Sequence, residues 1–339
     1  MTGKKVTIRD IANYLDVSVT TVSFALNDKG EISEETRSRI KEVARNMGYR
    51  PDHLARSLVT GVSHTVGVII PDVSNQFFAE TVRYLQTELA SCGYDMILCN
   101  SEELMQNDLK YIDLLSSRQV DGLIMTLSAQ SMEKENRALV QNALDRTGVP
   151  YVFLDRFYCE KMPVVSIDNV DSGYTVARHL IDHGHRNIGL ITGPMCLNSS
   201  FNRLEGFMKA MGESGIPVPE ENVVHLSYTM EAGRQGAQQL LKRGVTAIFA
   251  FNDLQAYGVL SYINECGLSV PEDVSLVGFD DVFYSSILRT KLTTVRQPIR
   301  ELATETCKMT IKLIKGEACP QTVKLKTELI VRDSVADIQ

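Results

Sequence analysis

The stretch from Thr7 to Asn27 places the strongest constraint on how this chain can fold. Its sequence, TIRDIANYLDVSVTTVSFALN, predicts two short helices joined by a tight turn. Thr7 is a candidate N-cap for the first helix, and the apolar residues after it recur at helical spacing. Ser18 is the candidate N-cap of the second helix, whose apolar face would include Val19 or Val22. A connection of about four residues is typical of a helix-turn-helix unit.

The second predicted helix carries small hydroxyl side chains, which can enter the major groove of DNA and meet phosphates and base edges. The residues of this stretch that we expect to contact DNA are Thr7, Ser18, Val19, Thr20, Thr21, Ser23, Phe24 and Asn27. The ring of Phe24 cannot donate a hydrogen bond, so we expect apolar contact with a thymine methyl there. The same pattern also fits two packed helices of a small bundle.

The charge of the chain is unevenly distributed. Its 339 residues suit two or three domains, and the net charge of −7 by itself argues against nucleic acid as a partner. Residues 1–60 nevertheless carry a net charge of +2, whereas residues 61–339 carry −9. This modest asymmetry fits a small DNA-binding head on an acidic body, although charged runs also form ordinary solvated surfaces.

The seven cysteines are widely spaced, and no pair has the spacing of metal ligands. We expect reduced thiols in the cytoplasm, with no metal and no cofactor. The first ten residues lack the apolar core of a signal peptide, and no apolar run approaches membrane-spanning length. The sequence therefore predicts a cytoplasmic protein without a membrane partner.

A third helix is predicted after Ser33, in SEETRSRIKEVARNMGY, and it would end at Gly48. The runs GYRP and LARSL follow it. Together with TIRDIA, VSVTTVSFALN and the start of the third helix, these runs resemble the lactose-repressor (LacI/GalR) family of bacterial transcription regulators. Later landmarks occur in the order of the family, so the resemblance covers nearly the whole chain.

The resemblance implies three parts: a helix-turn-helix DNA-binding head at 1–49, a hinge helix and linker at 50–63, and an effector-binding and dimerisation domain at 64–339. In the family the hinge helix lies in the minor groove. Leu58 would wedge between base steps there and kink the duplex, and the small Ala55 would let two hinge helices approach each other. Arg56 and Tyr49 complete the expected DNA contacts. Taken without the resemblance, the segment reads as a flexible linker.

From residue 64 onward, short apolar runs alternate with amphipathic segments. The expected strands are 66–70, 95–99, 122–126, 151–154, 188–192, 247–251, 274–278 and 293–295. The expected helices are 76–92, 103–117, 133–147, 170–183, 200–214, 231–243 and 253–266. Glycines follow the helices as C-cap candidates, namely Gly93, Gly148, Gly184, Gly215, Gly244 and Gly267. The pattern predicts a doubly wound α/β architecture with parallel sheets. The family arrangement is periplasmic-binding-protein-like, with one subdomain at about 64–165 and 296–323 and the other at about 166–293 and 325–337.

Polar side chains follow the predicted strands, and in open α/β sheets ligands bind beyond the carboxyl ends of the strands. Carboxylates, guanidinium groups and amides can pair with sugar hydroxyls, while aromatic rings can stack on the sugar faces. These positions are similar to those that hold the pentose in the periplasmic ribose-binding protein. The resemblance implies the ligand set Asn75, Phe77, Phe78, Asp155, Arg156, Arg203, Asn252, Asp280 and Gln297, with Tyr228 as an aromatic residue that closes the cleft.

Several of these residues also have structural interpretations. Asp72, Asn252 and Asp253 are candidate helix N-caps, and Asp253 suits that role best. Phe77 and Phe78 could belong to the core of the following helix, and Asp155–Arg156 could be an internal ion pair. A cluster of histidines near the run GHRNIG is expected to be solvated, namely His179, His183 and His185.

We expect a ligand-controlled transcription regulator, acting as a repressor, that binds a near-palindromic operator in double-stranded DNA as a homodimer. Its effector would be a monosaccharide, with D-ribose as the first choice. An enzyme acting on carbohydrate, with an aspartate acid/base pair, would leave the head unexplained, and a transport receptor would not need one. Within DNA regulation, the alternatives are a catabolite-control regulator that responds to a phosphocarrier protein and a purine-responsive repressor.

Overall fold

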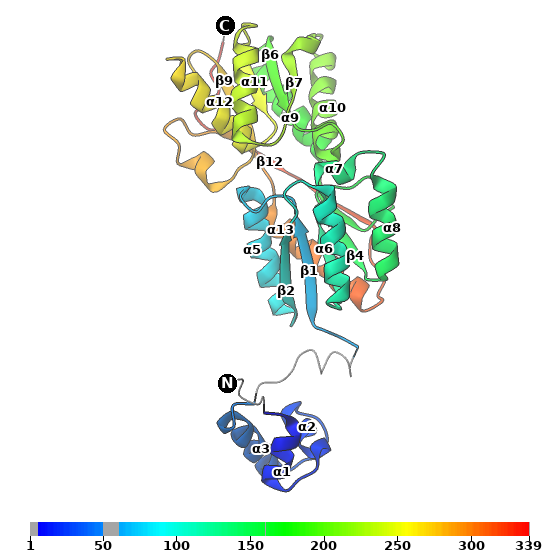
Figure 1. Ribbon diagram of the computed structural model, residues 1–339. Coiled ribbons are helices and arrows are strands. Elements are labelled where there is room, and N and C mark those ends of the chain that lie inside the picture. The colour runs from blue at the N-terminus through cyan, green and yellow to red at the C-terminus, as the bar shows by residue number, and fades with distance from the viewer. Residues whose placement is uncertain (1–5, 50–60, 160, 339) are drawn as a thin grey trace. The chain divides into compact units, whose positions relative to one another are not determined.

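The computed structural model describes residues 6–49, 61–159 and 161–338, and the chain divides into two compact units, Met1–Ser63 and His64–Gln339. The predicted hinge contacts Ala55, Arg56 and Leu58 lie outside the described residues. Figure 1 shows the helices of the first unit and the α/β elements of the second. The helices of the first unit are α1 (Ile8–Leu15), α2 (Val19–Leu26) and α3 (Glu34–Asn46).

The helices of the first unit begin where the sequence predicts. Thr7 forms a capping box with Asp10, since each side chain bonds the backbone N–H of the other, at 3.3 and 2.8 Å. Ser18 caps α2 by accepting from the backbone N–H of Thr21 at 3.0 Å. The buried core of the unit takes Val22 from α2, whereas Val19 is 41% exposed. The structure thus decides between the two candidates for the apolar face.

The second unit contains two six-stranded sheets. The first has the order β11-β5-β4-β3-β1-β2 and is parallel throughout. Its strands are β1 (Thr65–Ile70), β2 (Asp95–Asn100), β3 (Gly122–Met125), β4 (Tyr151–Leu154), β5 (Val164–Ile167) and β11 (Thr322–Leu325). The second has the order β12-β10-β9-β8-β6-β7, with β12 alone antiparallel to its neighbour. Its strands are β6 (Ile188–Thr192), β7 (Val223–His225), β8 (Ala247–Ala250), β9 (Ser275–Asp280), β10 (Thr293–Arg296) and β12 (Glu328–Ile330). The predicted α/β class with parallel sheets is confirmed.

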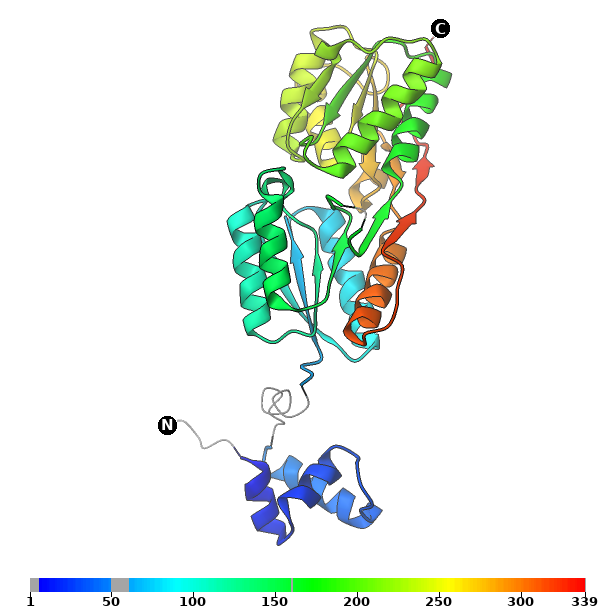
Figure 2. The same cartoon turned by 90° about the vertical axis from the view of Figure 1, so that its right-hand side faces the viewer.

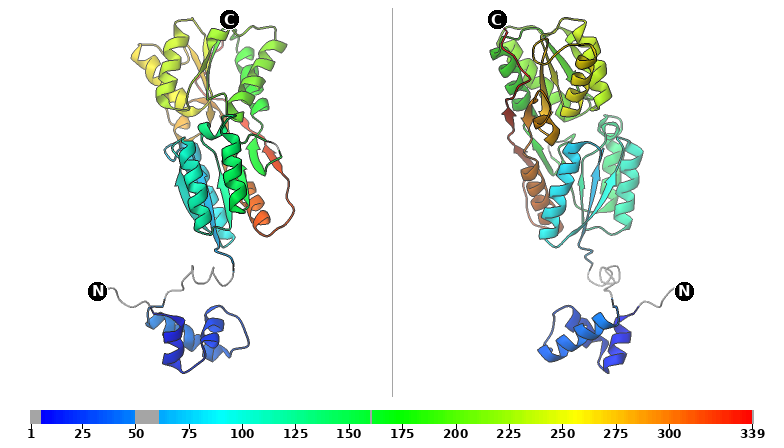
Figure 3. Two further views of the ribbon diagram at one scale, coloured as in Figure 1. Left: turned by 45° about the vertical axis from the view of Figure 1, so that its right-hand side comes forward. Right: turned by 90° about the vertical axis from the view of Figure 1, so that its left-hand side faces the viewer.

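Helices cover both faces of each sheet, so the strands are buried on both sides (Figures 2 and 3). The first lobe is the first sheet with its helices, which are α5 (Gln76–Ser91), α6 (Met105–Ser117), α7 (Ala129–Met132), α8 (Arg137–Thr147) and α13 (Ile299–Ile314). The second lobe is the second sheet with its helices, which are α9 (Asn169–Asp182), α10 (Asn198–Glu213), α11 (Met230–Leu241) and α12 (Asp253–Glu265). Short 3-10 turns occupy Glu220–Asn222 and Phe283–Ser286.

Most predicted elements are present, with some differences at their ends. The six C-cap glycines all have the positive φ that favours glycine at this position. The helix expected at 133–147 is wrong in its first turn, because α8 begins at Arg137 and the separate short helix α7 precedes it. The helix expected at 200–214 begins two residues earlier, because α10 starts at Asn198.

The expected solvation of the three histidines is wrong for His185. This side chain is fully buried, and its ring nitrogens pair with Thr246 Oγ1 at 2.9 Å and with the carbonyl oxygen of Ala336 at 3.2 Å. Burial lowers the pKa of His179 to about 4, so this ring is neutral at neutral pH. His185 therefore holds the C-terminal segment near Ala336 against the loop that follows α9.

Within the part of the chain that the structure describes, no helix combines the length and the apolar character needed to cross a membrane.

Candidate ligand-binding and DNA-binding sites

One pocket between the two lobes brings together all ten residues of the predicted ligand set. Its lining consists of Asn75, Phe77, Phe78, Asp155, Arg156, Ser199, Arg203, Tyr228, Asn252, Asp280 and Gln297. These residues follow the carboxyl ends of β1, β4, β6, β7, β8, β9 and β10, because the strands of a parallel sheet end at the same edge. The pocket encloses about 30 Å³. Whether these residues contact a ligand stays a prediction.

Arg156, from the first lobe, is buried and has a carboxylate partner. Its Nη1 and Nη2 donate to the two carboxylate oxygens of Glu103 at 3.0 and 2.9 Å, and Nη1 also donates to the carbonyl oxygen of Leu127 at 2.9 Å. Glu103 accepts in addition from the backbone N–H of Ala129 at 2.7 Å. Burial would lower the pKa of Arg156, but the charge of Glu103 raises it above its ordinary value. The alternative of an Asp155–Arg156 ion pair is therefore wrong, since the partner of Arg156 is Glu103.

Arg203, from the second lobe, is equally buried but is held by neutral groups. Its Nε donates to Asn169 Oδ1 at 2.8 Å, and its Nη1 donates to the carbonyl oxygen of Phe251. The guanidinium carbon lies 3.4 Å from the ring centre of Phe279. The close crossing of α9 and α10 sets this position, because a Cβ atom at Gly173 would overlap the carbonyl oxygen of Arg203. Among the described residues, no carboxylate lies within ion-pair distance of Arg203.

Two buried acceptor atoms in the pocket have no hydrogen-bond partner. They are Asp155 Oδ1 and Gln297 Oε1. Asp280 Oδ1 accepts from Gln297 Nε2 at 2.7 Å. Burial raises the pKa of Asp155 and of Asp280, and the nearby charge of Arg203 opposes this shift for both. Unsatisfied buried acceptors are costly, so the pocket is suited to a ligand that donates hydrogen bonds.

Aromatic rings form part of the wall. Phe77 and Phe78 are buried, with ring centres 5.1 Å apart in an edge-to-face arrangement, so their expected contribution to the core is present beside their place in the pocket. Arg156 lies over the ring of Phe78, 5.6 Å from its centre. The hydroxyl groups of Tyr228 and Ser200 hydrogen-bond to each other at 2.7 Å, which holds the Tyr228 ring in place.

Two asparagines of the set cap helices, which corrects the expectation for Asp253. Asn75 accepts from the backbone N–H of Phe77 at 3.0 Å as the N-cap of α5, and Asn252 accepts from that of Gln255 at 2.9 Å as the N-cap of α12. Asp253 is instead buried and accepts hydrogen bonds from three groups, namely Val282 N–H, Ser285 Oγ and Thr294 Oγ1. Asp72 is no helix N-cap either, because it accepts from Ser74 in the preceding turn.

Sequence reasoning missed two residues of this region. Ser199 lines the pocket from the first turn of α10, and Glu103 supports Arg156 from the loop after β2. The strand-end rule also applies to Glu103, since this residue follows β2 of the same sheet. Ser199 gave no signal of its own among the serines of the chain.

The described DNA-contact candidates lie in the first unit. Thr7, Ser18, Val19, Thr20, Phe24 and Asn27 are exposed, whereas Thr21, Ser23 and Tyr49 are half-buried. Thr20, Phe24 and Asn27 share one face of α2 because they are four and three residues apart. The ring of Phe24 is 42% exposed and packs on Gly30, where an added Cβ atom would crowd it at 2.6 Å. Only part of this ring can meet another molecule.

No cluster of three or more metal-ligating side chains occurs within residues 6–49, 61–159 and 161–338.

Comparisons with known proteins agree with both units. Residues 7–52 match the family model described as bacterial regulatory proteins, lacI family, and residues 177–335 match a periplasmic binding protein-like domain. The HTH-type transcriptional regulator DegA of Bacillus subtilis (strain 168) is 33% identical over 336 residues, which cover 98% of this chain and 99% of DegA. The HTH-type transcriptional repressor PurR of Yersinia pestis (strain Pestoides F) is 32% identical over 336 residues, covering 98% and 97% of the two chains.

Solved structures show the same similarity. The Lac repressor dimer bound to operator and the anti-inducer ONPF matches with a TM-score of 0.87 and 26% identity, over 98% of this chain and 100% of that one. A LacI family transcriptional regulator from Enterococcus faecium with bound ribose matches with a TM-score of 0.70 and 30% identity, over 81% and 100% of the two chains.

A helix-turn-helix unit followed by a two-lobed α/β body with a pocket between its lobes defines a ligand-responsive DNA-binding regulator. The chain belongs to the LacI family of bacterial regulatory proteins. Its relatives are transcription regulators and not enzymes. The chain is likewise a DNA-binding transcription regulator with a ligand-binding domain.

Proposed function

We propose that this regulator is a homodimeric repressor whose operator affinity is controlled by a monosaccharide, with D-ribose as the first choice. The sugar would occupy the pocket between the two lobes. The observation that carries the proposal is the chemistry of that pocket, where two buried acceptors without partners, Asp155 Oδ1 and Gln297 Oε1, lie among two guanidinium groups and three rings.

Each type of group in the pocket matches a part of a sugar. Hydroxyl groups can donate to Asp155, Asp280 and Gln297 while they accept from Arg203, and the C–H faces of the ring can stack on Phe77 or Phe78. The match to a ribose-bound LacI family regulator, at 30% identity, also favours a pentose.

The space of about 30 Å³ holds only a few water molecules, so a sugar enters only when the lobes or the rings move apart. Because both lobes supply contacts, the bound sugar would then hold them at a defined distance. For release of DNA, the sugar must favour one arrangement of the lobes and the operator the other.

The head would read DNA as one half of a symmetric pair. A single small head offers few base contacts, so two heads on a near-palindromic operator supply the missing affinity. Thr20 and Phe24 would face bases from α2, whereas Thr7 and Ser18, whose hydroxyls cap helices, would approach phosphates. Leu58 in the hinge segment would wedge between base steps. The site of action would be the cytoplasm.

Calorimetry on the full-length chain with ribose, other pentoses, hexoses and purine bases tests the effector. We expect ribose to bind, and the same sugar to change operator affinity in a DNA-binding titration. No heat with any free sugar, together with binding of a phosphocarrier protein, would overturn the proposal in favour of a catabolite-control regulator.

A second outcome is also informative, because a relative that is 32% identical is named a PurR repressor. Heat with a purine base and none with any sugar would replace the monosaccharide by a purine effector. The operator titration would then show whether the purine tightens or weakens DNA binding.

A further inference from the structure

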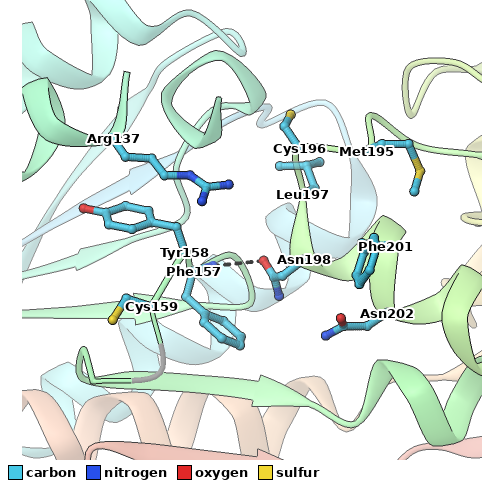
Figure 4. Close-up of a pocket in the computed structure, with 10 residues that line it drawn as sticks. All are labelled: Arg137, Phe157, Tyr158, Cys159, Met195, Cys196, Leu197, Asn198, Phe201 and Asn202. Carbon is cyan, nitrogen blue, oxygen red and sulfur yellow. Dashed lines mark hydrogen bonds between the residues drawn. The ribbon is translucent and has the colours of Figure 1, made fainter. Parts of the chain in front are cut away.

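A second cavity of about 280 Å³ lies between the two lobes (Figure 4). One wall comes from the first lobe, with Arg137 at the start of α8 and residues 157–159 after β4. The other wall comes from the second lobe, with residues 195–198 and the first turn of α10. Its lining shares no residue with the predicted sugar set, so it is a site of its own beside the sugar pocket.

Asn198 lines this cavity and connects the two lobes. Its Oδ1 accepts from the backbone N–H of Phe157 at 3.0 Å, and its Nδ2 donates to the carbonyl oxygen of Asp155 at 3.1 Å. These two bonds cross from α10 to the loop after β4. The shape of the cavity therefore depends on the distance between the lobes.

Arg137 presents a positive charge to the cavity and is held in a fixed orientation. Its Nε donates to the carbonyl oxygen of Met132 at 2.8 Å, and its guanidinium carbon lies 5.7 Å from the ring centre of Tyr158. Tyr158 is itself held by donation from its hydroxyl to Gln141 Oε1 at 3.0 Å. Figure 4 shows Arg137 and Tyr158 side by side on this wall.

Arg137 has no carboxylate partner within ion-pair distance among the residues that the structure describes. The described lining of the cavity includes no acidic side chain. The two Nη groups of Arg137 accordingly have no protein acceptor in the described part of the chain. A rigid guanidinium fork with free donors is the arrangement that binds carboxylate or phosphate through two parallel hydrogen bonds.

The opposite wall is mixed and partly open, since apolar side chains such as Leu197 and Phe201 lie there beside Asn198 and Asn202. Leu197 is buried, whereas the Phe201 ring is 54% exposed at the edge of the cavity. A large exposed ring across the cavity from an arginine without a described carboxylate partner suits a ligand that has both an anionic group and a flat or apolar face.

We propose that this cavity is a second ligand site that takes a small organic anion. The carboxylate or phosphate of the anion pairs with Arg137, and its ring lies against Phe201. Because both lobes form the walls, the anion favours this arrangement of the lobes. It therefore changes the affinity of the neighbouring pocket for its own ligand, and that ligand changes the affinity for the anion by the same factor.

The first test is calorimetry on the full-length chain with benzoate, phenyl phosphate, inorganic phosphate and the neutral analogue benzamide. We expect benzoate and phenyl phosphate to bind. Benzamide should bind about 10-fold more weakly or worse, because it lacks the charge that pairs with Arg137. Inorganic phosphate should bind more weakly than phenyl phosphate because it has no ring. Equal affinity for benzoate and benzamide, or no binding of either aromatic anion, would overturn the proposal.

The second test uses variants of two arginines in α8. Arg137→Gln should weaken the binding of benzoate about 10- to 100-fold, and Arg137→Lys should lie between this variant and the unaltered protein, because lysine keeps the charge without the fork. Arg146→Gln, an exposed position in the last turn of the same helix, should leave the affinity unchanged. Thermal unfolding would show that each variant is folded. Unchanged benzoate affinity in folded Arg137→Gln would contradict the assignment.

Sugar titrations with and without saturating benzoate then measure the coupling of the two sites. Coupling is supported if benzoate changes the sugar affinity by the same factor by which the sugar changes the benzoate affinity. Coupling is contradicted if neither ligand changes the affinity for the other. If no sugar binds at all, the proposal for the sugar pocket fails, whereas the benzoate tests of this cavity keep their meaning.

Discussion

The two lobes contribute one buried arginine each to the sugar pocket, and the two arginines differ in how their charge is balanced. Arg156 and Arg203 are both 3% exposed. Arg156 shares its charge with Glu103 through two hydrogen bonds, whereas Arg203 is held by an amide oxygen, a backbone carbonyl oxygen and an aromatic face. Arg203 has no carboxylate within ion-pair distance among the described residues, and a buried charge without a direct ion pair is unfavourable, so the second lobe is the one that gains most from an anionic or hydroxyl-rich partner.

This difference indicates separate tasks for the two side chains. With its charge already balanced, Arg156 can fix the shape of the first wall and keep clear of the neighbouring Asp155, whose Oδ1 stays open to a ligand. Arg203 influences both Asp155 and Asp280 by its charge, so it can organise the acceptors on both walls. The predictions below test this division of tasks.

The largest effect is expected for Arg203→Ala. Removing this side chain takes away the arginine charge that acts on Asp280 and one of the two that act on Asp155, and it removes donors to the ligand, so sugar affinity should fall about 100-fold or more. Operator binding in the absence of sugar should persist. Calorimetry measures the sugar affinity, and an operator titration measures the DNA affinity. Arg243→Ala, at an exposed position in the same lobe, is the control. Sugar affinity within about threefold of the unaltered protein would mean that Arg203 is only structural.

A smaller effect is expected for Glu103→Gln. Without the carboxylate, Arg156 loses its charged partner and can turn toward Asp155, which would occupy the acceptor that the ligand needs. We expect sugar affinity to fall about 10-fold. Glu102→Gln is the matched control, since Glu102 is exposed and has the same left-handed backbone, with φ of 56° at both positions.

The pH dependence of sugar binding in Glu103→Gln separates positioning from a general loss of structure. If Arg156 moves to Asp155, it should lower the pKa of that carboxyl and flatten the acid side of the profile. If the sugar affinity and its pH dependence in Glu103→Gln both match those of the unaltered protein, Glu103 has no role in sugar binding.

The smallest effect is expected from pH in the unaltered protein. Burial raises the pKa of Asp155 and of Asp280 in the empty pocket, and sugar hydroxyls donate best to the ionised carboxylates. As pH falls from neutral toward these raised pKa values, protons compete with the sugar, so affinity should fall on acidification, and at a higher pH than an ordinary aspartate would require. Asp155→Asn and Asp280→Asn should each remove part of this dependence. Affinity that rises on acidification would reverse the assignment of these carboxylates as acceptors.

Sequence patterns were sufficient for much of the fold. Strands such as Tyr151–Leu154 are continuous apolar runs, and glycines such as Gly148 end helices because they adopt positive φ, so both can be recognised locally. The edge strands β7 and β12, of three residues each, and helix α13 were not singled out. Three residues are too few for a periodicity to appear.

The ligand set was predicted from a rule about strand ends and from a resemblance, and the structure brings its ten members into one pocket. The interactions within the set were not predictable in this way. Arg156 and Glu103 are 53 residues apart, and the acidic neighbour Asp155 was the nearer candidate in sequence. The burial of His185 depends in the same way on Thr246 and Ala336, which come from distant parts of the chain.

The sequence by itself determined the helix-turn-helix unit, the α/β class and the polar residues at the strand ends, because capping, periodicity and strand-end position are local properties of the chain. Only the tertiary structure decided which buried charge has a partner, which acceptors stay open and where the second cavity lies. Those outcomes depend on distances between segments far apart in sequence, and electrostatic interactions in a buried site change steeply over a few ångströms. The four charged residues of the set could therefore have formed ion pairs with one another, and it is the packing of the two lobes that leaves the ten residues facing a pocket.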